Sequence, residues 1–131
     1  MARVRQKNTE PELVVRRCLH GLGYRFRLHR TDLPGTPDIV LPKYRKAIFV
    51  HGCFWHRHLG CKQTTTPKTR TEFWENKFRT NVRRDQNNMR KLSEAGWEPI
   101  VIWECEVADP SDLEGRLISL LNTEIPNSIS T

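Results

Sequence analysis

The sequence predicts one α/β domain in which a mixed sheet is flanked by helices. Short apolar runs typical of strands alternate with longer stretches of helical periodicity. One long helix also joins two buried strands, which favours a right-handed parallel crossover. A chain of 131 residues is long enough for one hydrophobic core. We therefore expect a single domain over 1–131, with a basic arm at 1–8 and a flexible tail at 122–131.

The expected order of elements is α-β-β-β-α-β-α. In the first helix, the Thr9 side chain accepts from the backbone of Glu12, whose carboxylate reaches back, and the helix ends at Gly21 or Gly23. The other elements follow from apolar runs and from turn signals at Gly and Pro. They are half-buried or buried strands over 24–28, 38–41, 47–51 and 98–103, a long helix capped by 69–72 and ending near 95, an irregular segment over 52–70, and a last helix capped by 111–114 and stopped by Pro126.

Positive charge is concentrated in two parts of the chain. The net charge is +7; residues 1–30 carry eight Lys and Arg against two acids, and residues 62–91 carry nine against three. From Glu104 onward there is one arginine against six acids. This asymmetry favours a polyanionic partner, nucleic acid before membrane, over a merely soluble basic protein. No apolar run approaches the ~20 residues of a membrane span and no signal peptide opens the chain, so we expect an intracellular protein.

Cysteine and histidine are spaced as in a zinc site. The candidate ligands are Cys53, His58, Cys61 and Cys105. Cys53 and Cys105 each stand two residues past a strand of the expected parallel pair, so the crossover brings them to one edge of the sheet. Three thiolates and an imidazole form a closed tetrahedral set typical of structural Zn²⁺. His56 is an alternative ligand from the same loop, unliganded thiols are the alternative to a metal site, and Cys18 reads as a small core residue.

A second group of residues indicates phosphodiester chemistry. Asp38 follows Pro37 at the start of one strand, and the next strand ends at His51. The Asp38 carboxylate and a main-chain carbonyl from 49–51 would together suit Mg²⁺, which prefers oxygen ligands. His51 and His56 flank this position and can exchange protons near neutral pH. Each signal has an ordinary reading, a turn for Pro-Asp and a structural role for either histidine, so the hypothesis depends on their convergence at one strand end.

Four segments give the chain a resemblance to a known family. They are PDIV at 37–40, IFVHGCFWH at 48–56, TRTEFW at 69–74 and VIWEC at 101–105. With these segments the chain resembles the very-short-patch-repair (Vsr) mismatch endonucleases, from residue 1 to about 121. The resemblance implies a restriction-endonuclease-like fold, a variant of the PD-(D/E)xK nucleases. The E-x-K of that class is absent here, so His51 and His56 would have to substitute for it.

The resemblance also implies a role for each active-site position. Asp38 and the main-chain carbonyl of Val50 would bind Mg²⁺, and Glu12 would bind the water shell of the metal. His56 would activate or orient the attacking water. His51 would act on the scissile phosphate or the leaving group.

The implied zinc ligands are the four residues found from spacing, with His58 rather than His56 as the imidazole. Phe54 and Trp55 would wedge into the base stack beside a T·G mismatch, and Met1 would do so from the other groove. Unstacking a base step costs a few kcal/mol and costs least at a mismatch, which gives a physical route to selectivity. The chain departs from the pattern at Arg57, which interrupts the histidine run.

These observations predict a Mg²⁺-dependent DNA endonuclease with a structural Zn²⁺ that nicks one strand beside a T·G mismatch. The implied process is very short patch repair of deaminated methylcytosine. Alternatives are a restriction-type nuclease that cuts matched DNA and a non-catalytic zinc module that binds DNA. The expected partner is double-stranded DNA containing a T·G mismatch, followed by downstream repair proteins. We expect a monomer in the bacterial cytoplasm, associated with the nucleoid through its substrate.

Overall fold

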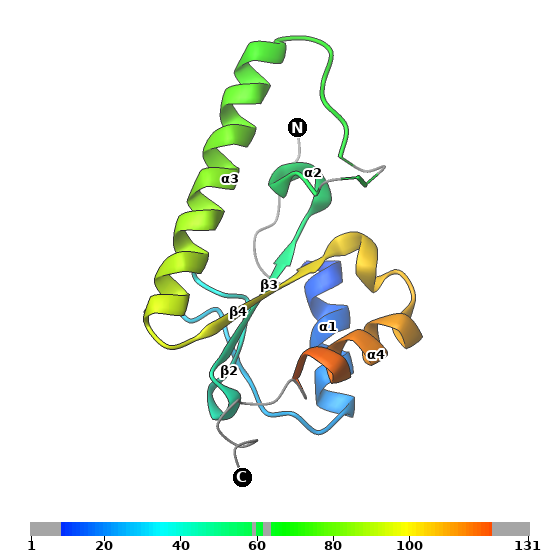
Figure 1. Ribbon diagram of the computed structural model, residues 1–131. Coiled ribbons are helices and arrows are strands. Elements are labelled where there is room, and N and C mark those ends of the chain that lie inside the picture. The colour runs from blue at the N-terminus through cyan, green and yellow to red at the C-terminus, as the bar shows by residue number, and fades with distance from the viewer. Residues whose placement is uncertain (1–8, 59, 62–63, 122–131) are drawn as a thin grey trace.

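A mixed four-stranded sheet forms the centre of the protein (Figure 1). The computed structural model describes residues 9–58, 60–61 and 64–121. The strands, in their order across the sheet, are β1 (Arg27–Leu28), β2 (Ile39–Leu41), β3 (Lys46–His51) and β4 (Glu98–Trp103). The helices are α1 (Glu10–Gly21), α2 (Cys53–His56), α3 (Thr71–Glu94) and α4 (Pro110–Leu121), with short 3₁₀ turns η1 (Pro42–Tyr44) and η2 (Glu104–Val107). The predicted α/β class and element order are confirmed, and α2 is an addition.

β3 and β4 form the predicted parallel pair. β1 pairs with β2 and β2 with β3 in antiparallel fashion, whereas β3 and β4 run parallel from the Lys46–Glu98 pair to the His51–Trp103 pair. The connection between the parallel strands passes through α2 and the long helix α3. The C-terminal ends of both strands therefore lie side by side, and α2 and η2 begin directly after them.

Helices cover both faces of the sheet (Figure 1). α1 and α4 lie on one face, and α3 lies on the other. Side chains of β3 alternate between the two faces, as the period of a strand requires: Ile48 joins the core under α1 and α4, and Phe49 joins the core under α3. The core under α1 and α4 contains Val15, Leu19, Ile39, Leu41, Ile48, Ile100, Ile102, Leu113, Leu117 and Leu121. Because helices pack on both faces of the sheet, the ends of its strands are held in fixed positions.

The helix starts differ in part from their prediction. The Thr9 hydroxyl accepts from the Glu12 backbone N–H (3.4 Å), as expected, but the Glu12 carboxylate turns inward instead of reaching back. The predicted cap of the long helix is wrong, because Arg70 occupies the N-cap in a left-handed conformation without a side-chain hydrogen bond. The last helix begins earlier than predicted, since the Asp109 carboxylate accepts from the backbone N–H of Ser111 (2.9 Å).

Two other local predictions are corrected. The strand expected over 24–28 is limited to Arg27–Leu28, and both residues are exposed. The predicted alternation is kept before it, because Tyr24 and Phe26 pack against the core whereas Arg25 is exposed. Segment 52–70 is not wholly irregular, because Cys53–His56 form the short helix α2. The predicted arm at 1–8, the tail at 122–131 and the stop at Pro126 lie outside the described residues. Within the described part of the chain, no helix has the length and apolar character that a membrane crossing requires.

Candidate active site and metal centre

Three clusters of metal-ligand side chains occur among the described residues. They are Cys53, His58, Cys61 and Cys105; Glu12, His29 and Asp38; and His51, His56 and Asp85. Within each cluster the potential ligand atoms all lie within 4.8 Å of one another. The end of β3 connects them, because it carries His51 and leads directly into α2.

The cysteine cluster has the dimensions of a tetrahedral zinc site. The His58 Nδ1 atom lies 3.6 Å from Cys53 Sγ and 3.4 Å from Cys105 Sγ. Tetrahedral Zn²⁺, with bonds of about 2.3 Å to sulfur and about 2.05 Å to nitrogen, would separate such atoms by about 3.6 Å. The His58 ring also stacks on Trp103, with centroids 4.3 Å apart, which fixes its orientation. The donor set therefore fits zinc, and His58 rather than His56 belongs to it.

Burial makes these thiols hard to ionise in the protein alone. Desolvation raises the pKa of the Cys53 thiol to about 12, and it also raises the pKa of Cys105. A divalent cation among them would favour the thiolate forms and offset that cost. The Cys53 backbone N–H donates to Glu104 Oε1 (2.9 Å), so α2 is also fastened to η2 through a bond that needs no metal.

The second cluster, Glu12, His29 and Asp38, places two acids close to each other near the C-terminal end of β3. Glu12 is only 1% exposed, and its Oε2 atom is hydrogen-bonded to His29 Nε2 (2.8 Å). Asp38 Oδ2 accepts from the backbone N–H of Val50 (2.8 Å). Burial raises the pKa of Asp38 to about 6, and the nearby Glu12 charge adds to this rise, while His29 and His56 oppose it. Arg16 Nε lies 3.5 Å from Glu12 Oε2 and offsets part of its charge. Two close carboxylates fit a hard divalent cation such as Mg²⁺.

The third cluster is a pair of stacked imidazoles held by an acid. The rings of His51 and His56 are parallel to within 6°, with centroids 3.8 Å apart. His56 Nδ1 is hydrogen-bonded to Asp85 Oδ2 at 2.6 Å. An ionised carboxylate can only accept, so this bond places the proton of a neutral His56 on Nδ1 and leaves Nε2 as its proton acceptor.

His51 differs from its neighbour in both burial and bonding. It is 6% exposed, and its buried Nδ1 has no hydrogen-bond partner among the described residues. Burial lowers the pKa of His51 to about 4, and the adjacent His56 contributes in the same direction. His51 is therefore neutral at neutral pH in the protein alone.

Two members of these clusters were not predicted from the sequence. Asp85 is the single acid between Glu75 and Glu94 on a strongly basic helix, and that isolation was a usable signal. His29 lies 17 residues from its partner Glu12, and no spacing rule connects the two. The predicted wedge residues Phe54 and Trp55 lie on α2, and their side chains are not among those described. Met1 lies outside the described residues.

Comparisons with known proteins agree with one another. The family model described as DNA mismatch endonuclease Vsr matches residues 1–63. The chain is 52% identical to the type II nicking enzyme V.XorIIP of Xanthomonas oryzae, over 93% of this chain and 89% of that protein. It is 39% identical to the type II nicking enzyme V.NmeAIP of Neisseria meningitidis, over 98% and 91% of the two chains. It is 43% identical to the DNA mismatch endonuclease Vsr of Escherichia coli, over 80% and 67%. The chain therefore belongs to the Vsr family of DNA endonucleases.

Proposed function

We propose that this endonuclease depends on Mg²⁺ and nicks one strand of duplex DNA beside a T·G mismatch. The observation that carries the proposal is the convergence of a buried acid pair and a stacked histidine pair at the end of β3. Relatives of the chain are named as nicking enzymes and as a mismatch endonuclease. The corresponding process is very short patch repair of deaminated methylcytosine, in the bacterial cytoplasm, by a monomer whose product passes to other repair proteins.

The acid pair would hold the metal. We assign Asp38 and the main-chain carbonyl of Val50 as Mg²⁺ ligands and Glu12 as the residue that binds the water shell. Bound Mg²⁺ would neutralise charge that develops on the phosphate and would favour ionisation of the attacking water. The hydrogen bond from Val50 to Asp38 keeps one carboxylate oxygen fixed, and His29 fixes the Glu12 carboxylate in the same way. Both acids are thus oriented before DNA binds.

The histidine pair would handle protons. His56, held by Asp85 through Nδ1, accepts a proton from the attacking water at Nε2. His51 is neutral in the protein alone and would first contact the scissile phosphate as a neutral ring. A phosphate anion beside it raises its pKa and favours the protonated form that a leaving oxygen requires. His56 and His51, with ring centroids 3.8 Å apart, would in this way supply a base and an acid.

The cysteine cluster would bind a structural Zn²⁺ through Cys53, His58, Cys61 and Cys105. Its role would be to hold α2 against the end of the sheet, and α2 carries His56 at its C-terminal end. The same helix carries Phe54 and Trp55, which we propose as the wedge beside the mismatch, with Met1 entering from the other groove. Zinc would then stabilise both the mismatch reader and the base.

A panel of labelled duplexes, matched or with one T·G pair in varied contexts, tests the proposal in Mg²⁺ and in EDTA. A nick in one strand, only at T·G and only with Mg²⁺, is the expected result. Cleavage of both strands of matched DNA would replace the proposal with a restriction-type nuclease. Tight binding without cleavage in any metal would replace it with a non-catalytic zinc DNA-binding module. Asp38→Ala should abolish nicking while DNA binding remains.

A further inference from the structure

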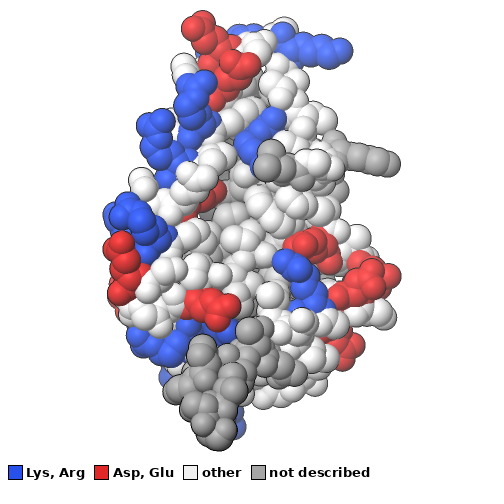
Figure 2. Space-filling view, in the orientation of Figure 1, with Lys and Arg blue, Asp and Glu red and all other residues white. Residues whose placement is uncertain are grey.

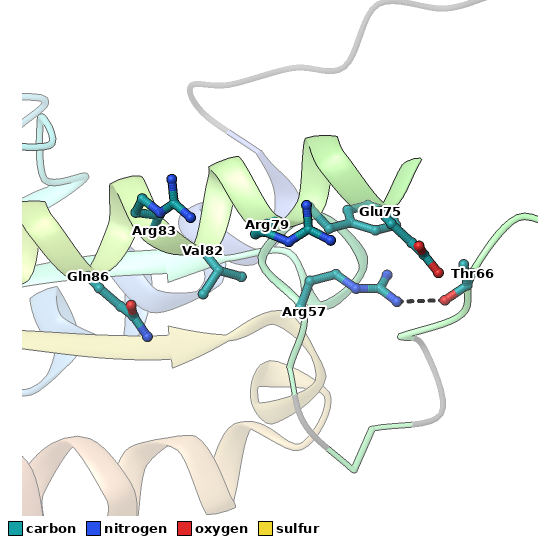
Figure 3. A pocket seen from close by; sticks show the side chains of 8 residues that line it. Arg57, Thr66, Glu75, Arg79, Val82, Arg83 and Gln86 are labelled. Atoms are coloured by element: carbon teal, nitrogen blue, oxygen red, sulfur yellow. Dashed lines mark hydrogen bonds between the residues drawn. The ribbon is translucent and has the colours of Figure 1, made fainter. Parts of the chain in front are cut away.

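A shallow groove of about 510 Å³ runs along α3, opposite the segment that follows α2 (Figure 3). Phe78 and Val82 give it an apolar lining, and three arginines, Arg57, Arg79 and Arg83, line it as well. None of these residues is needed for the chemistry described above. The groove is therefore a separate feature of the surface.

Arg57 builds one wall of this groove. It ends α2 in a left-handed conformation, with φ at +56°. Its guanidinium donates to the Thr65 carbonyl (2.8 Å) and to Thr66 Oγ1 (2.8 Å), and it lies over the Phe78 ring at 3.9 Å (Figure 3). These contacts fasten the segment to α3. The same segment carries His58 and Cys61 of the cysteine cluster, so the wall is anchored at two places.

The charge of the groove is positive. Arg79 and Arg83 are one helical turn apart and exposed, and Figure 3 shows both extending from α3. Arg79 Nη1 donates to Asn76 Oδ1 (2.7 Å), a neutral partner that leaves the charge uncompensated. Glu75 is the single acid in the lining and stands at one end. Figure 2 shows basic side chains along α3, whereas acidic ones gather over η2 and α4.

The groove lies beside the candidate active site, since its lining residue Arg57 directly follows His56. Its last lining residue on α3 is Gln86, which follows Asp85, the hydrogen-bond partner of His56. The stretch from Glu75 to Gln86 covers eleven residue steps, about 16 Å of helix. A DNA strand rises 3.4 Å per nucleotide along the duplex axis, so this length matches about five nucleotides.

We propose that this groove binds the sugar–phosphate backbone of the DNA that flanks the nick site, with Arg79 and Arg83 contacting phosphates. The inference rests on the proposed function for the identity of the DNA. The positive charge, the Val82 side chain in the lining and the position next to His56 in the chain fit a backbone better than a base edge. Such contacts fix the register of a protein on DNA and make its affinity depend on salt.

Salt dependence of binding tests this inference. We would compare the intact chain with Arg79→Gln/Arg83→Gln by fluorescence anisotropy on a labelled T·G duplex, in Ca²⁺ to prevent cleavage, from 50 to 300 mM salt. The slope of log Kd against log salt should fall by about two, since each phosphate contact contributes about 0.9. Arg84→Gln/Arg90→Gln is the matched control, because both arginines are exposed on α3, contact an asparagine three residues earlier and lie outside the groove.

The outcomes separate the groove from general charge and from the proposed function. An unchanged slope in the groove variant, or an equal fall in the control, overturns the inference. Methylphosphonate linkages, which are uncharged, should weaken binding of the intact chain at the flanking phosphates and have no further effect on the groove variant. Nicking by the intact chain is measured on the same duplex. A reduced slope without nicking keeps the groove and rejects the proposed function, and nicking with an unchanged slope does the reverse.

Discussion

Replacing Asp38 by Asn should stabilise the metal-free protein while it destroys activity. Burial raises the pKa of Asp38 from 3.8 to about 6, so the folded chain binds this proton more readily than the unfolded chain. Between about pH 4 and pH 6 the free energy of unfolding therefore falls as pH rises. The shift of about two units corresponds to about 3 kcal/mol at pH 7.5, an upper bound for a half-buried group. The Asn amide carries no charge, and its oxygen can still accept from the Val50 N–H.

Urea unfolding in EDTA at pH 4, 6 and 7.5 measures this effect. Asp38→Asn should gain up to about 3 kcal/mol at pH 7.5 and almost nothing near pH 4. Asp32→Asn is the control: Asp32 is exposed and hydrogen-bonded to Arg30, which lowers the pKa of its carboxyl, so this variant should not gain stability. Excess Mg²⁺ should stabilise the unmodified chain and leave Asp38→Asn unchanged. A gain of equal size at pH 4 and pH 7.5 would refute an electrostatic origin.

Three further predictions concern the histidine and cysteine clusters. Burial lowers the pKa of His51 to about 4, so its neutral ring contributes stability above about pH 6.5 that is lost as pH falls toward 4. His51→Gln should therefore flatten that part of an unfolding profile, and an unchanged profile would contradict the assignment. Asp85→Asn should lower the nicking rate about 100-fold and alter its pH profile with DNA affinity kept, which loss of structure alone would not do. Cys105→Ser should lose bound zinc in a metal assay, whereas Cys18→Ser should retain it; one equivalent retained by Cys105→Ser would exclude the four-ligand site.

Topology made part of the site predictable. Cys105 is more than forty residues from Cys53, and only the parallel crossover of β3 and β4 brings it near. That crossover follows from a long amphipathic helix between two apolar runs, so the sequence was sufficient. The partners of Glu12 and His56 were not predictable in the same way, because His29 and Asp85 depend on how a strand end and a helix face are packed. Local capping rules also failed at Arg70, which occupies the N-cap in a left-handed conformation without a side-chain hydrogen bond.

The short helix α2 links the cysteine cluster to the histidine that we propose as the general base. Four residues are far too few for a stable helix in isolation, so contacts at its two ends must hold it. Cys53 at the first end donates to Glu104 and joins the cysteine cluster, and His56 at the other end bonds Asp85. Arg57 directly follows α2, and its guanidinium lies over the ring of Phe78 on α3. Loss of the cysteine cluster would leave the first end held by the Cys53–Glu104 bond alone, so the proposed general base and the groove wall would be held less firmly.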